Sequence, residues 1–225
     1  MIYLMDTDGE AQGLLPLLPS WKRERLEKLK NEKARLQSGC AWALLGYGLK
    51  TEYGRTDWPP VELGVHGKPE FRREEGGLGV PFFSLSHTDG AAMCALDDGP
   101  VGADIQKIVP FRERTVRRYA SEREWRALTL LPDPERAAIR LWTFKEAYVK
   151  YQGTGIGVDL RSLDFSHTVF SEDGARFLLC GLHFLTGAYG DSLYTVCGHT
   201  AWGAPALIHR EQLEKAACLL ETGLI

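Results

Sequence analysis

The sequence predicts an α+β fold in which helices followed by antiparallel strands occur twice. The first helical pattern covers about residues 20–50, with a break near Asn31, and short strands and turns fill 61–96. The second helical block covers about 112–150. Runs of helices followed by runs of strands indicate α+β rather than alternating α/β architecture. We therefore expect two similar halves that form one compact unit. The later strands are expected near 163–170, 176–186 and 192–198.

Local signals mark where these elements begin and end. A short strand at 1–5 opens the chain, and a helix through 211–216 closes it. Ser121-x-x-Glu124 is a capping box, which predicts a helix start at that point. Asp133-Pro134-Glu135 places an Asp at the N-cap and a Pro at the first helical position. Gly153 is expected to end the second long helix.

Composition excludes several classes of protein. The 225 residues are 44% hydrophobic and 25% charged, which is typical of a globular chain with its own core. No apolar run is long enough to cross a bilayer, and residues 1–6 are too short and acidic for a signal peptide. The net charge of −3 argues against nucleic-acid binding. Isolated cysteines without a C-x-x-C pair indicate reduced core residues, so we expect a cytoplasmic protein without membrane contact. The cysteines are Cys40, Cys94, Cys180, Cys197 and Cys218.

Two apolar runs in the centre of the chain predict a β-hairpin. Residues 91–96 and 101–106 are joined by Asp-Asp-Gly-Pro, a strong turn signal. In the second run, side-chain alternation puts Gly102, Asp104 and Gln106 on one face. Gly102 would leave room there for something bulky. A carboxylate and an amide oxygen two residues apart are oxygen ligands suited to Mg²⁺. A solvent-facing Asp and Gln would show the same pattern.

The helix around residues 142–150 carries Lys145, Glu146 and Lys150. Glu146 and Lys150 are four residues apart and therefore share a face. Glu146 would add a second carboxylate to Asp104 at a metal site. The spacing alone favours an ordinary helix salt bridge, because such pairs are common on exposed helix faces.

Four motifs in order resemble those of the Sfp-type 4′-phosphopantetheinyl transferases. The resemblance implies two α/β halves related by a pseudo-twofold axis, a monomer of pseudo-dimeric architecture, with coenzyme A in the cleft between the halves. Residues 1–100 would hold the 3′-phosphate and adenine side, and residues 101–225 the metal and catalytic helix. The motifs are Gly67-Lys68-Pro69, Phe83-x-Leu85-Ser86-His87, Val101-Gly102-x-Asp104-Ile105 and Trp142-Thr143-x-Lys145-Glu146-Ala147-x-x-Lys150.

The resemblance also implies an activity and the residues that perform it. Such enzymes transfer the 4′-phosphopantetheine arm of coenzyme A to a serine of an apo acyl or peptidyl carrier protein, releasing adenosine 3′,5′-bisphosphate. Asp104, Gln106 and Glu146 would hold Mg²⁺. Glu146 would act as the base, Lys150 would donate to the departing phosphate, and Lys145 would neutralise it.

Basic residues are concentrated in two helical regions, 22–35 and 107–126, each with seven Lys or Arg against three Glu. A solvated helix face is the usual explanation. The resemblance implies instead that the first region meets the 3′-phosphate and that acidic carriers meet basic surface. The residues expected to contact coenzyme A are Lys22, Arg25, Arg35, Gly67, Lys68, Pro69, Ser86 and His87.

Gln106 is the main departure from the family pattern, because many members carry Glu there. An amide oxygen can coordinate Mg²⁺ but brings no charge. This leaves room for a rival function, a protein that binds coenzyme A or a carrier without turnover. A serine hydrolase built on Ser86 and His87 is disfavoured, because adjacent residues of a strand point to opposite faces.

Overall fold

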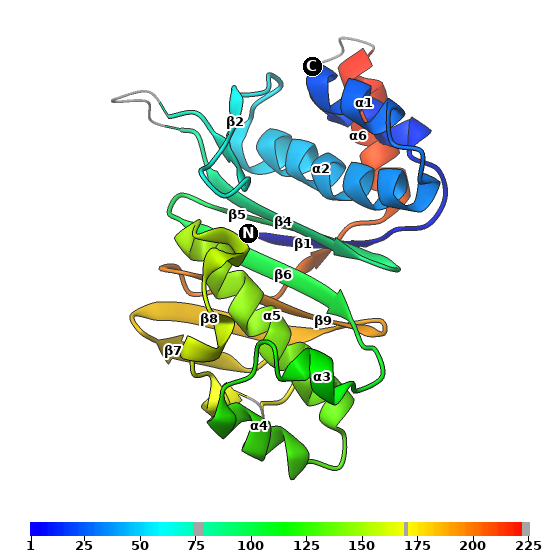
Figure 1. Ribbon diagram of the computed structural model, residues 1–225. Coiled ribbons are helices and arrows are strands. Elements are labelled where there is room, and N and C mark those ends of the chain that lie inside the picture. The colour runs from blue at the N-terminus through cyan, green and yellow to red at the C-terminus, as the bar shows by residue number, and fades with distance from the viewer. Residues whose placement is uncertain (74–78, 169–170, 222–225) are drawn as a thin grey trace.

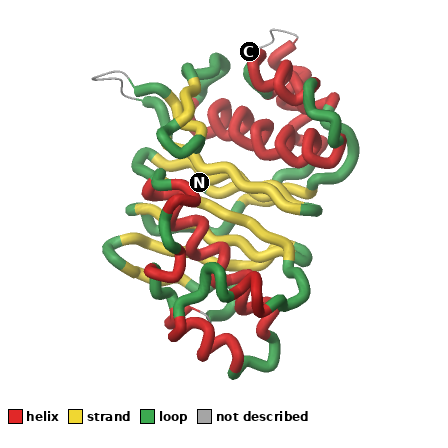
Figure 2. Tube along the Cα trace, viewed as in Figure 1, coloured by secondary structure: helices red, strands yellow, loops and turns green. Residues whose placement is uncertain are grey.

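Two four-stranded sheets, each covered by a long helix, form the protein (Figures 1 and 2). The structure is a computed structural model that describes residues 1–73, 79–168 and 171–221. Helices and antiparallel sheets occur in both halves, which confirms the predicted α+β class. The first sheet has the order β10-β1-β5-β4 and the second the order β6-β9-β8-β7. The strands are β1 (Ile2–Asp6), β2 (Val61–Leu63), β3 (Pro69–Phe71), β4 (Phe82–Thr88), β5 (Ala91–Asp97), β6 (Val101–Lys107), β7 (Arg176–Leu179), β8 (Leu182–Tyr189), β9 (Ser192–Gly198) and β10 (Ala206–Leu207).

The helices begin and end where the local signals predict. Asn31 separates the first two helices, and its side chain accepts a hydrogen bond from the Ala34 amide at 3.0 Å. Ser121 and Glu124 form a complete capping box, and Gly153 ends the longest helix of the second half in the left-handed conformation. None of the described helices is both long and apolar enough to cross a membrane. The helices are α1 (Ser20–Glu27), α2 (Glu32–Tyr53), α3 (Glu113–Val116), α4 (Glu122–Thr129), α5 (Pro134–Gln152) and α6 (Arg210–Glu221), with short 3₁₀ helices at Gln12–Leu17, Gly155–Gly157, Leu160–Ser162 and Ser166–Thr168.

The predicted central hairpin is wrong. β5 pairs with β1 and β4, whereas β6 pairs with β9 in the other sheet. The turn at 97–100 therefore carries the chain from one sheet to the other. Both strands are buried over most of their length, so each finds partners on more distant segments instead of its neighbour in sequence.

Two later strand predictions also need correction. The strand expected near 163–170 is a 3₁₀ turn at Ser166–Thr168 in its described part, and residues 169–170 lie outside the described residues. The run at 176–186 is split into β7 and β8 by a turn at Cys180 and Gly181, both with positive φ. The strand predicted at 192–198 coincides with β9.

The C-terminal segment returns to the first half. β10 pairs in parallel with β1, and α6 packs on the first core through Leu213 and Ala217, against the 3₁₀ helix Gln12–Leu17 and α2. The predicted closing helix is thus α6, but residues 206–221 lie with the first sheet. A division into 1–100 and 101–225 assigns β10 and α6 to the second half. Their contacts are mainly with the first half.

Three cysteines are buried as predicted, and two are not. Cys40, Cys94 and Cys197 lie in the cores, whereas Cys180 and Cys218 are exposed.

An apolar layer between the two sheets joins β1 and β5 to β6.

A row of hydroxyl groups on β4 joins the two sheets next to this layer. β4 and β6 lie side by side but belong to different sheets, so no backbone ladder connects them. Every second residue of β4 instead offers a side-chain oxygen to a β6 amide, which satisfies donors on the free edge of β6. We call this row the hydroxyl seam. Its contacts are Ser84 Oγ with the Ala103 amide (2.9 Å), Ser86 Oγ with the Ile105 amide (3.2 Å) and Thr88 Oγ1 with the Lys107 amide (3.1 Å).

Candidate active site

A cavity of about 270 Å³ lies between the two halves and collects several predicted site residues. Gly67, Lys68 and Pro69 line it from the β2–β3 region of the first half. Glu146 and Lys150 line it from α5 of the second half. Leu85 of the Phe83-x-Leu85-Ser86-His87 motif lines the same cavity, so the structure brings three of the sequence motifs together across the boundary between the halves.

Asp104 lies on β6 at the edge of this site and is only 6% exposed. Its Oδ1 atom accepts hydrogen bonds from Ser86 Oγ and from Lys150 Nζ, both at 2.7 Å. Its Oδ2 atom is buried and has no hydrogen-bond partner among the residues that the structure describes. An unpaired buried carboxylate oxygen is costly, which indicates a position prepared for a cation.

Glu146 supplies a second carboxylate near Asp104. Burial raises the pKa of Glu146, the charge on Asp104 raises it further, and Lys150 opposes the shift. Two carboxylates that repel each other, one with an unpaired oxygen, fit the oxygen ligands that Mg²⁺ prefers. The described residues contain no cluster of three or more His, Cys, Asp or Glu side chains suited to a metal. The protein would thus contribute two carboxylates, leaving other positions to ligand and water oxygens.

Lys150 forms its ion pair with Asp104 and not with Glu146, its neighbour on the helix. Its ammonium group also donates to the backbone oxygens of Ala103 at 3.1 Å and Leu85 at 3.4 Å. This geometry disfavours the ordinary helix salt bridge and ties α5 to β6.

Gly102 has a different role from the one that the alternation suggests. A Cβ atom there would lie 1.9 Å from the Ala147 carbonyl oxygen and 2.4 Å from the Tyr151 amide nitrogen. The space beside Gly102 is therefore filled by the α5 backbone and not by a ligand. This close approach is what allows Glu146 to come near Asp104.

Gln106 contacts β4 and lines a second cavity. Its amide nitrogen donates to Thr88 Oγ1 at 3.4 Å, and the side chain lines a second, mostly apolar cavity of about 490 Å³. Val109 and Trp142 lie on the same cavity. The position on the strand face was predicted correctly, but the structure gives Gln106 contacts of its own away from the carboxylates.

Lys145 is placed in the interior and not at the site, which corrects its predicted catalytic role. Its side chain is 0% exposed and pairs with Glu124, also 0% exposed, at 2.6 Å. Three backbone carbonyl oxygens surround the same ammonium group, at 2.6–2.8 Å. Burial lowers the pKa of Lys145, and Glu124 opposes this shift. An ammonium group enclosed in this way cannot reach a phosphate in the cleft.

Lys68 lies on the opposite wall from α5. Its ammonium group donates to the Val101 carbonyl oxygen at 3.1 Å and lies 3.8 Å from Glu70. Burial lowers its pKa, Glu70 opposes the shift, and Lys150 contributes a smaller lowering effect. Lys68 and Lys150 are therefore close enough to act on the same anion.

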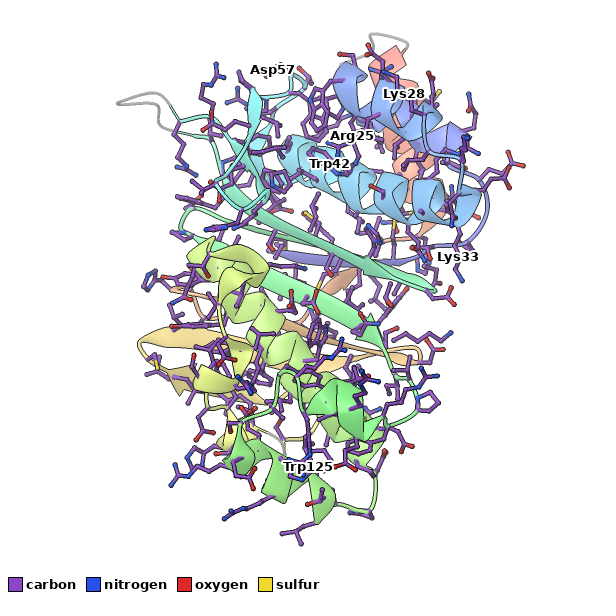
Figure 3. All side chains as sticks on the ribbon, in the orientation of Figure 1. Arg25, Lys28, Lys33, Trp42, Asp57 and Trp125 are labelled. Atoms are coloured by element: carbon purple, nitrogen blue, oxygen red, sulfur yellow. The ribbon has the colours of Figure 1, made fainter. Side chains whose placement is uncertain are left out.

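Two basic side chains of α1, Lys22 and Arg25, are expected at the coenzyme A site. Lys22 is 9% exposed, and its ammonium group lies 5.1 Å from the centre of the Trp42 ring. Burial lowers the pKa of Lys22 to about 8, and Arg25 adds to the shift. Figure 3 shows Arg25 near Trp42 where α1 lies over α2.

His87 links these basic side chains to the carboxylates. Partial burial lowers its pKa, Lys150 and Lys22 lower it further, and Asp104 opposes them. The neutral form is thus favoured at neutral pH in the free protein. Arg35 pairs with Glu32 at 3.6 Å, so its expected place beside the phosphate has no supporting contact.

Two residues at the site were missed by the sequence analysis. Trp42 supports Lys22 but looks like any core aromatic on a helix, so no local signal distinguishes it. His66 precedes the Gly-Lys-Pro motif and packs against Gly155, where a Cβ atom would lie 2.4 Å from His66 Cβ. A glycine-rich loop directly after the catalytic helix was the available signal, since such loops permit close approach.

Comparisons with known proteins agree with this geometry. Residues 100–197 match the 4′-phosphopantetheinyl transferase superfamily model. The chain is 35% identical over 117 residues to the 4′-phosphopantetheinyl transferase psf-1 of Bacillus pumilus, covering 50% of this chain and 46% of the relative. The chain thus spans about half the length of that relative and of HetI from Nostoc, which is 34% identical over 125 residues.

A longer match covers most of both chains. The L-aminoadipate-semialdehyde dehydrogenase-phosphopantetheinyl transferase of Saccharomyces cerevisiae is 33% identical over 210 residues, which is 83% of this chain and 73% of the relative. Together with the motifs and their convergence on one cavity, this shows that the chain belongs to the 4′-phosphopantetheinyl transferase superfamily.

Proposed function

We propose that the protein transfers 4′-phosphopantetheine from coenzyme A to a serine of an apo acyl or peptidyl carrier protein and releases adenosine 3′,5′-bisphosphate. The observation that carries the proposal is the convergence of Asp104, Glu146 and Lys150, with Asp104 Oδ2 buried and unpaired. A coenzyme A diphosphate placed there would meet both carboxylates through a cation and the ammonium groups of Lys150 and Lys68.

Glu146 is the proposed base. A serine hydroxyl is a weak nucleophile at neutral pH, so its proton must be removed as it attacks the β-phosphorus. The pKa of Glu146 is raised by burial and by Asp104, which makes it a better proton acceptor than an ordinary carboxylate. Mg²⁺ held by Asp104 and Glu146 would supply charge neutralisation for the diphosphate oxygens.

Lys150 and Lys68 are the proposed donors to the phosphate groups. Phosphoryl transfer depends mainly on positioning and on neutralising the charge that develops on the leaving phosphate. Lys150 is held by Asp104 and two backbone oxygens, so its ammonium group is positioned before the ligand binds. At the other end of the ligand, Lys22, Arg25 and His87 are proposed to hold the 3′-phosphate.

The carrier is proposed to dock at the second cavity. The cavity begins at Gln106, the next residue after Asp104 on the same strand face, so a protein seated there could present a serine to the diphosphate. Its lining is mostly apolar, and Val109 is 46% exposed. Arg112 lies on the rim, which suits an acidic partner.

We also propose a cytoplasmic monomer. Burial raises the pKa of Cys40 to about 11 and raises that of Cys94 and Cys197 still more, so these thiols stay protonated and unreactive. The protein therefore needs no disulfide in its cores. Equilibrium sedimentation would measure the oligomeric state directly.

A transfer assay tests the proposed activity. The protein is incubated with a fluorescent coenzyme A, Mg²⁺ and a panel of apo fatty-acid, polyketide and peptide carriers, and the mass of each carrier is measured. The wild type should add the mass of the labelled phosphopantetheine to at least one of them. Glu146→Gln should slow transfer by about 10²–10⁴-fold, the usual contribution of a general base.

The same assay separates an enzyme from a binding protein. A wild type that binds coenzyme A but modifies none of the carriers would support the non-catalytic alternative. Transfer by Glu146→Gln at the wild-type rate would show that this carboxylate is neither the base nor an essential ligand.

A further inference from the structure

Ser86 occupies a different place from the one that its motif implies. The resemblance assigns it to coenzyme A, yet its side chain is buried and the residue is 8% exposed. Its hydroxyl donates to Asp104 Oδ1 at 2.7 Å and accepts from the Ile105 amide at 3.2 Å. A hydroxyl has a single proton to donate, so its donor is fully used by the carboxylate.

The two carboxylate oxygens of Asp104 differ in their hydrogen-bond partners. Oδ1 receives donors from Ser86 and Lys150, whereas Oδ2 receives none. Rotation of the carboxylate plane away from this position would break two short hydrogen bonds, whereas a half-turn only exchanges two equivalent oxygens. The pair of donors therefore selects one orientation and keeps Oδ2 available.

Ser86 is the more rigid of the two donors. Its side chain has one rotatable bond, and the Ile105 amide fixes the hydroxyl from the other side. Lys150 reaches the same oxygen on a long side chain that is 26% exposed, and it must also be free to interact with the ligand. The orientation of Asp104 thus depends mainly on Ser86 once the ligand attracts Lys150.

We propose that Ser86 is a positioning residue that holds the Asp104 carboxylate with Oδ2 ready for the metal ion. The inference rests on the proposed function, since it concerns the cation of the same site. Outer partners that orient a metal ligand typically change metal affinity by about 10- to 100-fold when they are removed. The hydroxyl acts here through Asp104 and does not touch the reacting atoms.

Ser84 provides a matched control on the same strand. Its hydroxyl belongs to the same hydroxyl seam, where it accepts from the Ala103 amide at 2.9 Å and lies 3.4 Å from the Ala103 carbonyl oxygen. Ser84 is 2% exposed and lines the first cavity, so the coenzyme A affinity of each variant is measured beside its Mn²⁺ affinity. Ser84→Ala and Ser86→Ala therefore each remove one buried hydroxyl and leave one β6 amide without its acceptor. Only Ser86→Ala releases the carboxylate of Asp104.

The test measures metal binding without turnover. Mn²⁺ is titrated into each variant in the presence of coenzyme A and the absence of any carrier, and free Mn²⁺ is followed by electron paramagnetic resonance. Ser86→Ala should weaken Mn²⁺ binding by about 10- to 100-fold. Ser84→Ala should stay near the wild-type affinity, and Ser86→Thr, which keeps the hydroxyl, should restore most of it. Thermal unfolding should show similar losses for the two alanine variants.

The outcomes separate this inference from the proposed function. Equal Mn²⁺ affinity of the wild type and Ser86→Ala would overturn the positioning role while leaving the metal site intact. An equal loss in Ser84→Ala and Ser86→Ala would also overturn it, because the hydroxyl seam as a whole would then be responsible. A wild type that retains no Mn²⁺ with coenzyme A would remove the metal site itself, and the positioning role with it.

Discussion

Replacing Lys145 with methionine should destabilise the protein far more than it impairs the chemical step. The variant keeps the length of the side chain but removes a charge that is 0% exposed and paired with Glu124. It also leaves the carbonyl oxygens of Tyr119, Leu160 and Leu163 without their shared donor. These contacts of Lys145 join α5 to α4 and to the loop after α5. Their loss therefore affects the packing of the second half.

The magnitude follows from what remains around Glu124. Breaking a buried ion pair by removing one partner costs about 3–5 kcal/mol, because the other charge stays buried. Glu124 would still accept from the Ser121 amide at 2.6 Å and the Phe165 amide at 2.7 Å. These two contacts favour the lower end of the range. For a chain of this size the loss corresponds to a decrease in Tm of about 6–20 °C.

Thermal and urea unfolding would measure the stability, and carrier transfer would be assayed at a temperature where the variant is still folded. Lys150→Met is the matched control, since Lys150 is partly exposed and lines the cavity. We expect it to lose transfer with a smaller change in Tm. Adding Glu124→Gln to Lys145→Met should recover part of the stability, because no uncompensated charge then remains buried.

The reasoning would be refuted by the opposite pattern. A Lys145→Met protein with wild-type Tm and greatly reduced transfer would show that this ammonium group serves catalysis, as the motif resemblance implies.

Three further predictions concern the helix contact, the nucleotide and the carrier. Gly102→Ala should cost about 3 kcal/mol or more, because its Cβ would lie 1.9 Å from the Ala147 carbonyl oxygen; a wild-type Tm would contradict this contact. The preference for coenzyme A over dephospho-coenzyme A, measured by calorimetry, should fall as pH rises through about 8, where Lys22 loses its proton and the attraction to the 3′-phosphate. Lys22→Met should remove this pH dependence, and its persistence would exclude Lys22 as the cause. Val109→Asp should raise KM for the carrier by about five- to tenfold without changing coenzyme A affinity, whereas Leu178→Asp on β7 should change neither; equal effects of the two substitutions would argue against docking at the second cavity.

Local signals predicted the helix ends well because capping depends on a few adjacent residues. Asn31 and the Ser121–Glu124 box satisfy amides at most three residues away, so the sequence contains the whole interaction. Strand partners were predicted less well. The hairpin at 91–106 had a suitable turn, but the pairing of β5 with β1 and of β6 with β9 depends on segments about ninety residues away.

Helical spacing could have corrected one assignment at the site. Residues four apart share a helix face, whereas residues five apart are separated by about 140° around the axis. Glu146 and Lys150 accordingly line the cavity together. Lys145 lies on the buried side of the same helix, where it pairs with Glu124 of α4. The motif identified the helix, and helix geometry separates the face that lines the cavity from the buried face.

The sequence by itself determined the α+β class, the capped helix ends and the family, because these depend on local spacing and on motif order. Only the tertiary structure decided what each residue does. Ser86 meets Asp104 across the hydroxyl seam, and Gln106 turns to a separate cavity. Both outcomes depend on β4 and β6 lying side by side without a backbone ladder, an arrangement that arises from the packing of two whole sheets and that no short stretch of sequence encodes.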